Sequence, residues 1–167
     1  MASSDSADLL QPALLDRLTD MDPEQQREAR DRRVISMQRL RESVRRDLAW
    51  LLSAGRFETL VDLEEYPEVA NSVLNYGVPD ISGMQVAGAD VELIERAVLA
   101  AIQRFEPRLD RRALKVKVSA DSSSMQRNAM VFEIQAELWG RPLPQAILWR
   151  SELDLETGSA DVREGDR

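Results

Sequence analysis

The chain has 167 residues, of which 43% are hydrophobic and 31% charged, a length and composition typical of one soluble globular domain. It has no cysteine, no histidine and no apolar run of the roughly 18–20 residues that span a membrane, so we expect no disulfide, zinc–thiolate site, metal, cofactor or membrane insertion. Its net charge of −8, of which residues 57–112 contribute −6, argues against a nucleic-acid partner, because phosphates attract basic surfaces.

Residues 1–33 are predicted to be an N-terminal segment outside the main domain. The chain begins with acidic residues, unlike an export signal, so we expect a cytoplasmic protein. Leu10, Leu14, Leu15 and Leu18 recur at helical spacing, which predicts a short amphipathic helix, and a polar spacer follows it. This helix either folds back on the domain or docks on a partner, and the sequence leaves both possibilities open.

Residues 34–160 are predicted to form a single α+β domain, followed by a C-terminal tail at residues 161–167. Apolar residues recur at steps of three and four from Val34 to Leu52, which predicts the first long helix of the domain. Gly55 is well placed to end this helix. Arginines between Arg27 and Arg46 offer a phosphate-binding face. The acids interleaved with these arginines favour an ordinary solvated face instead.

The stretch "EYPEVANSVLNYGVPDISG", residues 65–83, is the least generic part of the sequence. Pro67 is suited to begin a short helix. The apolar side of that helix would consist of Val69, Val73 and Leu74. Tyr66 and Tyr76 are the only tyrosines in the chain; they are either packing residues or interface anchors, and we favour packing.

A second long helix is predicted from Asp90 to Phe105 or Glu106, where Pro107 ends it. Arg108 is favourably placed beside the negative end of the helix dipole, whereas Glu106 is not and therefore needs a partner. That partner is either an arginine of the same chain or an arginine of another protein. A general acid at Glu106 would have to hold a proton, which the neighbouring arginines oppose, so we expect no enzyme.

After residue 112 the spacing of apolar residues changes from about 3.6 to 2, which predicts strands. Three alternating segments follow one another: "ALKVKVSA", "MVFEIQAEL" and "QAILWRSELDLETG". Each has one apolar face, which is typical of an antiparallel meander covered on one side. We therefore expect an α+β fold, in which N-terminal helices and the helix ending in Glu-Pro-Arg pack on a small antiparallel sheet of about three strands.

Five segments occur in an order that resembles a known family: "LLDRLTD", "RDLAWLLS", "YPEVANSVLNYGVPDISG", "FEPRL" and "LDLETG". Together, from about Leu14 to Gly158, they resemble the type VI secretion baseplate subunits of the TssE family, within the lysozyme-like baseplate wedge family of contractile phage tails. Glu106, Pro107 and Arg108 match the Glu-Pro-Arg motif of that family. The resemblance implies an α+β fold and a structural, non-enzymatic role.

The resemblance also implies partners and a location. The partners are the wedge subunits TssF, TssG and TssK and the sheath subunits TssB and TssC, in a cytoplasmic baseplate docked at the inner membrane complex. Strand exchange at an edge of the sheet would start the sheath. The Glu-Pro-Arg motif would then be a polar assembly site, and Leu14, Leu15 and Leu18 would dock on a wedge partner. A muramidase-type hydrolase using Glu106 and a baseplate protein of a contractile phage-like particle stay open as alternatives.

Overall fold

The structure is a computed structural model that describes residues 13–19, 36–81, 89–119, 129–139 and 144–165. The helices are α1 (Leu14–Leu18), α2 (Met37–Ser53), α3 (Pro67–Ala70) and α4 (Ala89–Phe105), and there are two 3₁₀ turns, η3 (Phe57–Thr59) and η4 (Val73–Asn75). The strands are β1 (Lys115–Ser119), β2 (Ala129–Leu138), β3 (Gln145–Asp154) and β4 (Ala160–Glu164). The fold is α+β, as predicted, and none of the described helices is long and apolar enough to cross a membrane.

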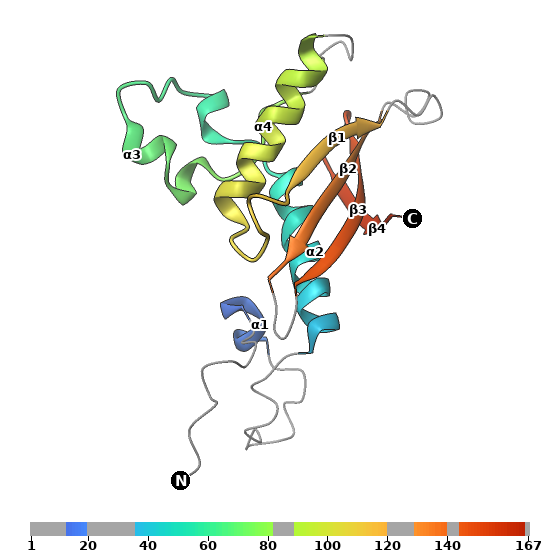
Figure 1. Cartoon of the computed structure of the whole chain (residues 1–167). Helices are drawn as coiled ribbons and strands as arrows, with labels where there is room; N and C mark the ends of the chain where they lie inside the picture. The colour runs from blue at the N-terminus through green and yellow to red at the C-terminus, as the bar shows by residue number, and fades with distance from the viewer. Residues whose placement is uncertain (1–12, 20–35, 82–88, 120–128, 140–143, 166–167) are drawn as a thin grey trace.

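The four strands form an antiparallel meander in the order β1-β2-β3-β4 (Figure 1). β2 and β3 pair along their whole length, from Ala129 opposite Asp154 to Leu138 opposite Gln145. β4 corrects the prediction, because residues 161–164 lie in the sheet and not in a tail. The sequence did not predict β4 because Val162 is its only large apolar side chain, and one residue makes no alternating pattern.

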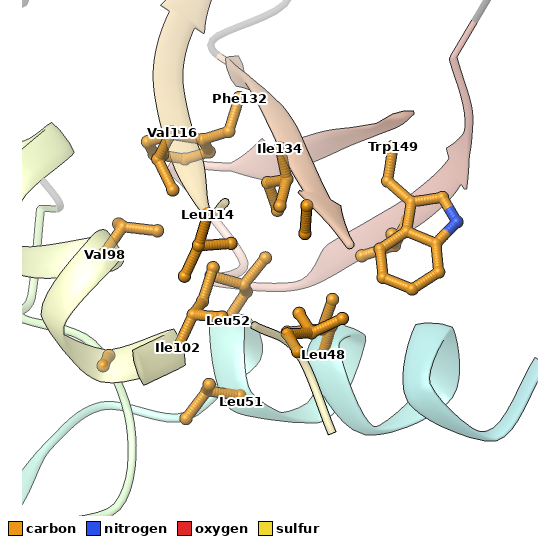
Figure 2. Close-up of a cluster of buried hydrophobic side chains, with 14 of the residues drawn as sticks. Leu48, Leu51, Leu52, Val98, Ile102, Leu114, Val116, Phe132, Ile134 and Trp149 are labelled. Carbon is orange, nitrogen blue, oxygen red and sulfur yellow. The ribbon is translucent and has the colours of Figure 1, made fainter. Parts of the chain in front are cut away.

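The helices pack on one face of the sheet, where α2 contacts β3 and β4 and α4 contacts β1. Apart from the half-buried Val118 and Leu155, the strand residues predicted to face the helices are buried there, and Phe132, Ile134 and Trp149 have no exposed surface. Figure 2 shows these side chains above Leu48 of α2 and Ile102 of α4, which are also fully buried. At about 25 cal/mol per Å² of apolar surface, this burial is the main stabilising contribution to the fold.

The helix ends follow local sequence signals. α2 begins after Ser36, whose Oγ accepts a hydrogen bond from Arg39 N at 3.2 Å. Residues 20–35, which include the predicted polar spacer and the earlier part of the long helix, lie outside the described residues. α4 ends at Phe105, two residues before Pro107, as predicted.

Between α2 and α4 the chain makes an excursion that we call the 57–76 lobe. Its base is closed by two hydrogen bonds, from Arg56 N to Val78 O at 3.0 Å and from Val78 N to Ala54 O at 2.8 Å. Gly77 stands at this base with φ 126°, and a Cβ there would lie 2.3 Å from Ala54 O. Only glycine fits this position, so the lobe leaves and rejoins the domain at one tightly closed point.

The short helix inside the lobe differs from its prediction. α3 ends at Ala70, and Ser72 then adopts an extended conformation and accepts a hydrogen bond from Leu74 N through its Oγ at 3.1 Å. This cap starts η4 in a new direction, so Val73 and Leu74 are exposed instead of lying on the buried side of one helix.

Candidate protein–protein assembly site

The Glu-Pro-Arg motif lies at the corner between α4 and the end of β2. Glu106 N still donates a helical hydrogen bond to Ile102 O at 2.9 Å, and Pro107, which has no N–H, cannot continue the helix. The carbonyl oxygen of Arg108 then accepts a hydrogen bond from Trp139 N at 2.8 Å. The motif is thereby held between a helix end and a strand end, with a defined backbone on both sides.

Glu106 and Arg108 bind each other through a two-pronged ion pair. Arg108 Nε donates to Glu106 Oε1 at 2.6 Å, and Arg108 Nη2 donates to Glu106 Oε2 at 2.5 Å. The backbone N of Arg108 also donates to Oε1, at 3.1 Å. The Glu106 side chain is only 3% exposed and that of Arg108 24%. The partner that Glu106 needs therefore lies in the same chain, and its fork geometry makes the pair strong and directional.

The pair belongs to a longer series of alternating charges that we call the ion-pair network (Asp16, Arg46, Asp47, Glu106 and Arg108). Arg108 Nη2 donates to Asp47 Oδ2 at 2.6 Å, and Asp47 Oδ1 accepts from Arg46 Nη2 at 2.8 Å. Arg46 Nη1 donates in turn to Asp16 Oδ1 at 2.5 Å. The network thus joins the end of α4 to α2 and α2 to α1.

The ionisation of this network follows from its contacts. Burial lowers the pKa of Arg108, but the hydrogen bonds and charges of Glu106 and Asp47 outweigh burial and raise the pKa above its usual value. The hydrogen bond to Asp16 raises the pKa of Arg46. Burial raises the pKa of Asp16, but the hydrogen bonds from Arg46 and Ser43 lower it by a larger amount, so the net shift of the pKa is downward. These three groups are therefore charged at neutral pH.

A pocket of about 270 Å³ opens beside the network. Its apolar lining includes Leu15, Trp50, Tyr76 and Phe105, and the last two rings meet edge to face with centroids 5.1 Å apart. Arg108 also lines the pocket, and its Nη1 is buried without a hydrogen-bond partner among the described residues. Because an unsatisfied buried donor is unfavourable, this atom would gain from an oxygen supplied by another molecule.

The predicted N-terminal helix folds back on the domain and also keeps its leucines uncovered. α1 rests on α2 through Asp16, whose Oδ2 accepts a hydrogen bond from Ser43 Oγ at 2.9 Å. The side chains of Leu14, Leu15 and Leu18 are 70%, 44% and 74% exposed. Of the three, only Leu15 lines the pocket beside Arg108. The structure thus brings one predicted leucine together with the Glu-Pro-Arg motif and leaves the other two as separate exposed apolar residues.

The two other chemistries considered from the sequence gain no geometric support. Both oxygens of Glu106 accept hydrogen bonds from Arg108 in an enclosed position, whereas a general acid must carry a proton and reach a substrate. Arg41, Arg45 and Arg46 of the Arg27–Arg46 cluster have side-chain partners within the chain; for example, Arg45 Nη1 donates to Val162 O at 2.8 Å. Within the described residues, no group of three acidic side chains could hold a metal ion.

Two residues of the ion-pair network, Asp16 and Asp47, were not predicted as site residues from the sequence. Asp47 precedes the buried Leu48 in α2, so it lies on the flank of the apolar stripe, where a charged side chain is half-buried and needs a counter-charge. That position in the sequence pattern could have indicated that Asp47 has a charged partner. Nothing in the sequence pointed to Arg108 as the counter-charge, because the two residues are 61 positions apart.

Comparison with known proteins adds one match. The family model described as baseplate wedge protein gp25 matches residues 38–143. This range includes almost all of α2, the 57–76 lobe, α4, the Glu-Pro-Arg motif, β1 and β2. No curated protein matches the chain significantly.

Proposed function

The chain belongs to the baseplate wedge protein gp25 family, the family of TssE, and on this premise we propose that it links wedge subunits to the sheath of a type VI secretion system and initiates sheath polymerisation. A structural role in the baseplate of a contractile phage tail or type VI machine follows from the family itself. The proposal adds the secretion machine, the wedge partners TssF, TssG and TssK, the sheath partners TssB and TssC, and a cytoplasmic position at the inner membrane complex.

The open sheet is the observation that carries sheath initiation. β1 and β4 each pair with one neighbour only within the described sheet, so each has an outer row of backbone groups to which a strand of another chain can add. Helix side chains occupy part of each row: Val118 N donates to Glu95 Oε1 at 2.8 Å, and Ala160 N donates to Ser53 Oγ at 2.9 Å. Side chains can rotate away from an arriving strand, so these contacts restrain uncontrolled pairing without closing the edges.

The pocket beside Arg108 and the leucines of α1 support a second, wedge-facing surface. The pocket offers an apolar lining and the unpartnered Nη1 of Arg108, which suit an apolar side chain followed by a carbonyl or carboxylate oxygen. The exposed Leu14 and Leu18 extend the available apolar area beyond the pocket. On this proposal, the wedge subunits bind here and the sheath subunits bind at the sheet edge.

Co-purification from native cells tests the proposal. A tagged wild-type chain is expected to retain TssF, TssG, TssK, TssB and TssC, as identified by mass spectrometry. Leu14→Ser combined with Leu18→Ser is expected to lose the wedge subunits. Arg108→Lys is expected to lose them as well, because lysine keeps a positive charge beside Glu106 but has no counterpart of the unpartnered Arg108 Nη1. Leu93→Ser, at a residue 52% exposed on α4, is the matched control and should retain them.

Three outcomes would overturn the proposal in different ways. Recovery of a phage tail sheath protein in place of TssB and TssC would assign the chain to a phage-like particle. Recovery of no wedge subunit with the wild-type chain would contradict the partners. If imaging of labelled TssB showed normal sheath assembly in cells that lack the gene, the initiating role would be contradicted.

A further inference from the structure

The 57–76 lobe combines a defined backbone with exposed apolar side chains. Its three most exposed apolar residues are Leu60 at 81%, Val73 at 77% and Leu74 at 69%. Phe57, Val61 and Tyr66 are also exposed. η4 contacts both η3 and α3, so the elements that carry or flank these residues adjoin one another. In Figure 1 the lobe stands beside α4. Leu60 also lines a pocket of about 370 Å³ with Leu153 of β3 and the turn that follows β3. An apolar surface of this kind on an ordered segment is typical of an interaction site.

Polar contacts, not the exposed apolar residues, hold the lobe in shape. Asn75 is only 3% exposed; its Oδ1 accepts from Glu58 N at 2.9 Å, and its Nδ2 donates to Ala70 O at 3.1 Å. Arg104 of α4 donates to Ala70 O and to Asn71 Oδ1, both at 2.8 Å. The exposed apolar side chains are therefore presented on a surface that forms without them.

The lobe is also strongly acidic. Between residues 57 and 76 there is no lysine or arginine, and the acidic residues are Glu58, Asp62, Glu64, Glu65 and Glu68. All five are exposed. Within the described residues, only Glu58 among them forms an ion pair, with Arg56 at 3.5 Å. A field of one sign beside an apolar patch selects a partner of the opposite charge.

We propose that the 57–76 lobe docks a basic amphipathic segment of another protein. The apolar side of that segment covers Leu60, Val73 and Leu74, and its lysines or arginines meet the carboxylates around them. Repulsion between like charges disfavours the lobe of a second copy as the occupant. Leu60, Val73 and Leu74 do not line the pocket beside Arg108, and the proposed function assigns them no partner. The proposal therefore goes beyond the proposed function and does not depend on which machine contains the chain.

Photocrosslinking in native cells tests the proposal. The full chain is produced with p-benzoylphenylalanine in place of Leu60 or of Leu74, and the crosslinked peptides are sequenced by mass spectrometry. Leu93, exposed on α4 outside the lobe, is the control position. We expect a higher crosslink yield at Leu60 and Leu74 than at Leu93. The crosslinked peptide should come from another protein and combine apolar residues with an excess of lysine and arginine. The absence of such crosslinks, a peptide from a second copy of this chain, or a peptide without basic excess would overturn the proposal.

A variant with fewer charges tests whether the carboxylates of the lobe attract the basic segment. Glu64→Gln, Glu65→Gln and Glu68→Gln together should lower the crosslink yield at Leu60 about fivefold or more, because three carboxylates each contribute a modest attraction. The control makes the same change in net charge outside the lobe, with Glu42→Gln, Glu92→Gln and Glu137→Gln, at exposed positions that do not line a pocket with Leu60. Circular dichroism confirms that both variants fold. An equal fall in both, or in neither, would contradict the role of the acidic lobe.

Discussion

Arg108 joins residues that are distant in the sequence, since its guanidinium binds Glu106 after α4 and Asp47 in α2. The energetic question at this position is how much Glu106 depends on Arg108. A carboxylate that is 3% exposed cannot recover its lost hydration, so it requires a counter-charge. Removing that counter-charge should therefore cost more than the pair itself contributes.

Arg108→Met is expected to lower the free energy of unfolding by about 3 kcal/mol, because it leaves Glu106 buried and unpaired. Adding Glu106→Leu should restore most of the loss, since two apolar side chains can replace a buried pair. Chemical denaturation of wild type, single and double variants measures both effects. If the double variant were less stable than Arg108→Met alone, the Glu106 carboxylate would have stabilising partners beyond Arg108.

Asp16 gives the attachment of α1 a pH dependence. Burial raises the pKa of Asp16, but hydrogen bonds from Arg46 and Ser43 and the charges of Arg46 and Arg108 bring it below the ordinary value of 3.8. A carboxylate with a lowered pKa stabilises the folded contact above 3.8 and loses that contribution as the pH falls through its lowered value. We therefore expect α1 to detach from α2 only below about pH 3.8.

A spin label can follow this detachment, because the chain has no cysteine and Leu18→Cys, on an exposed position, creates a single attachment site. The label mobility should rise as the pH falls below 3.8. With Asp16→Asn, the label should already be mobile at pH 7 and show no such step. Circular dichroism at each pH separates local detachment from acid unfolding. An identical step in both variants would assign the pH dependence to another group.

At the scale of elements, side chains from the helices protect the sheet edges. Glu95 of α4 accepts hydrogen bonds from Val118 N at 2.8 Å and from Lys117 Nζ at 3.1 Å. On β4, Ser53 Oγ of α2 accepts a hydrogen bond from Ala160 N, and Arg45 Nη1 of α2 donates one to Val162 O. An unprotected edge strand can pair with other chains, so we expect these contacts to disfavour self-association of the isolated protein.

Glu95→Ala should therefore increase self-association through β1, because it frees an outward N–H and the side chain of Lys117. Glu92→Ala removes the same charge from an exposed position of the same helix and is the matched control. Sedimentation velocity over a concentration series should show larger species for Glu95→Ala only. Monomers for both variants would show that Glu95 does not guard the edge.

The elements differ in how well the sequence predicts them. Alternation in β2 predicted its buried face, and Pro107 predicted the end of α4, because both signals act through local geometry. The lobe was harder, since the spacing of Val73 and Leu74 continues a helical pattern that the cap at Ser72 interrupts. Packing was the favoured prediction for both tyrosines; it holds for Tyr76, which contacts Phe105, but not for Tyr66, which is 57% exposed.

The candidate site was predictable only in part. Its motif residues Glu106, Pro107 and Arg108 were recognisable in the sequence, and the structure pairs the two charged ones with each other. The contact of Arg108 with Asp47 spans 61 positions and depends on how α4 crosses α2. A pattern within one element contains no information about such a crossing, so the ion-pair network and the pocket beside it emerge only from the tertiary fold.

At the scale of the whole molecule, the terminal elements α1 and β4 differ in burial, so we expect them to contribute unequally to stability. α1 has no buried residue and is joined to α2 by an ion pair whose partners, Asp16 and Arg46, are 20% and 33% exposed. A chain that starts at Ser36 should therefore unfold cooperatively, with a free energy of unfolding within about 1 kcal/mol of the full chain. Thermal and chemical denaturation of this truncated chain measures the difference. A larger loss would show that residues 1–35 contribute to the core.

The opposite truncation, a chain that ends at Ala160, removes most of β4. The truncation removes Val162, whose side chain is 1% exposed, and this loss of apolar burial alone should lower the free energy of unfolding by roughly 1.5–3 kcal/mol. The ladder with β3 and the hydrogen bond from Arg45 to Val162 O are lost as well, so we expect a total loss above about 3 kcal/mol. A chain that ends at Gly165 keeps all of β4 and is the matched control. Equal stability of the two would restore residue 160 as the end of the domain, whereas the expected difference extends the domain to Gly165.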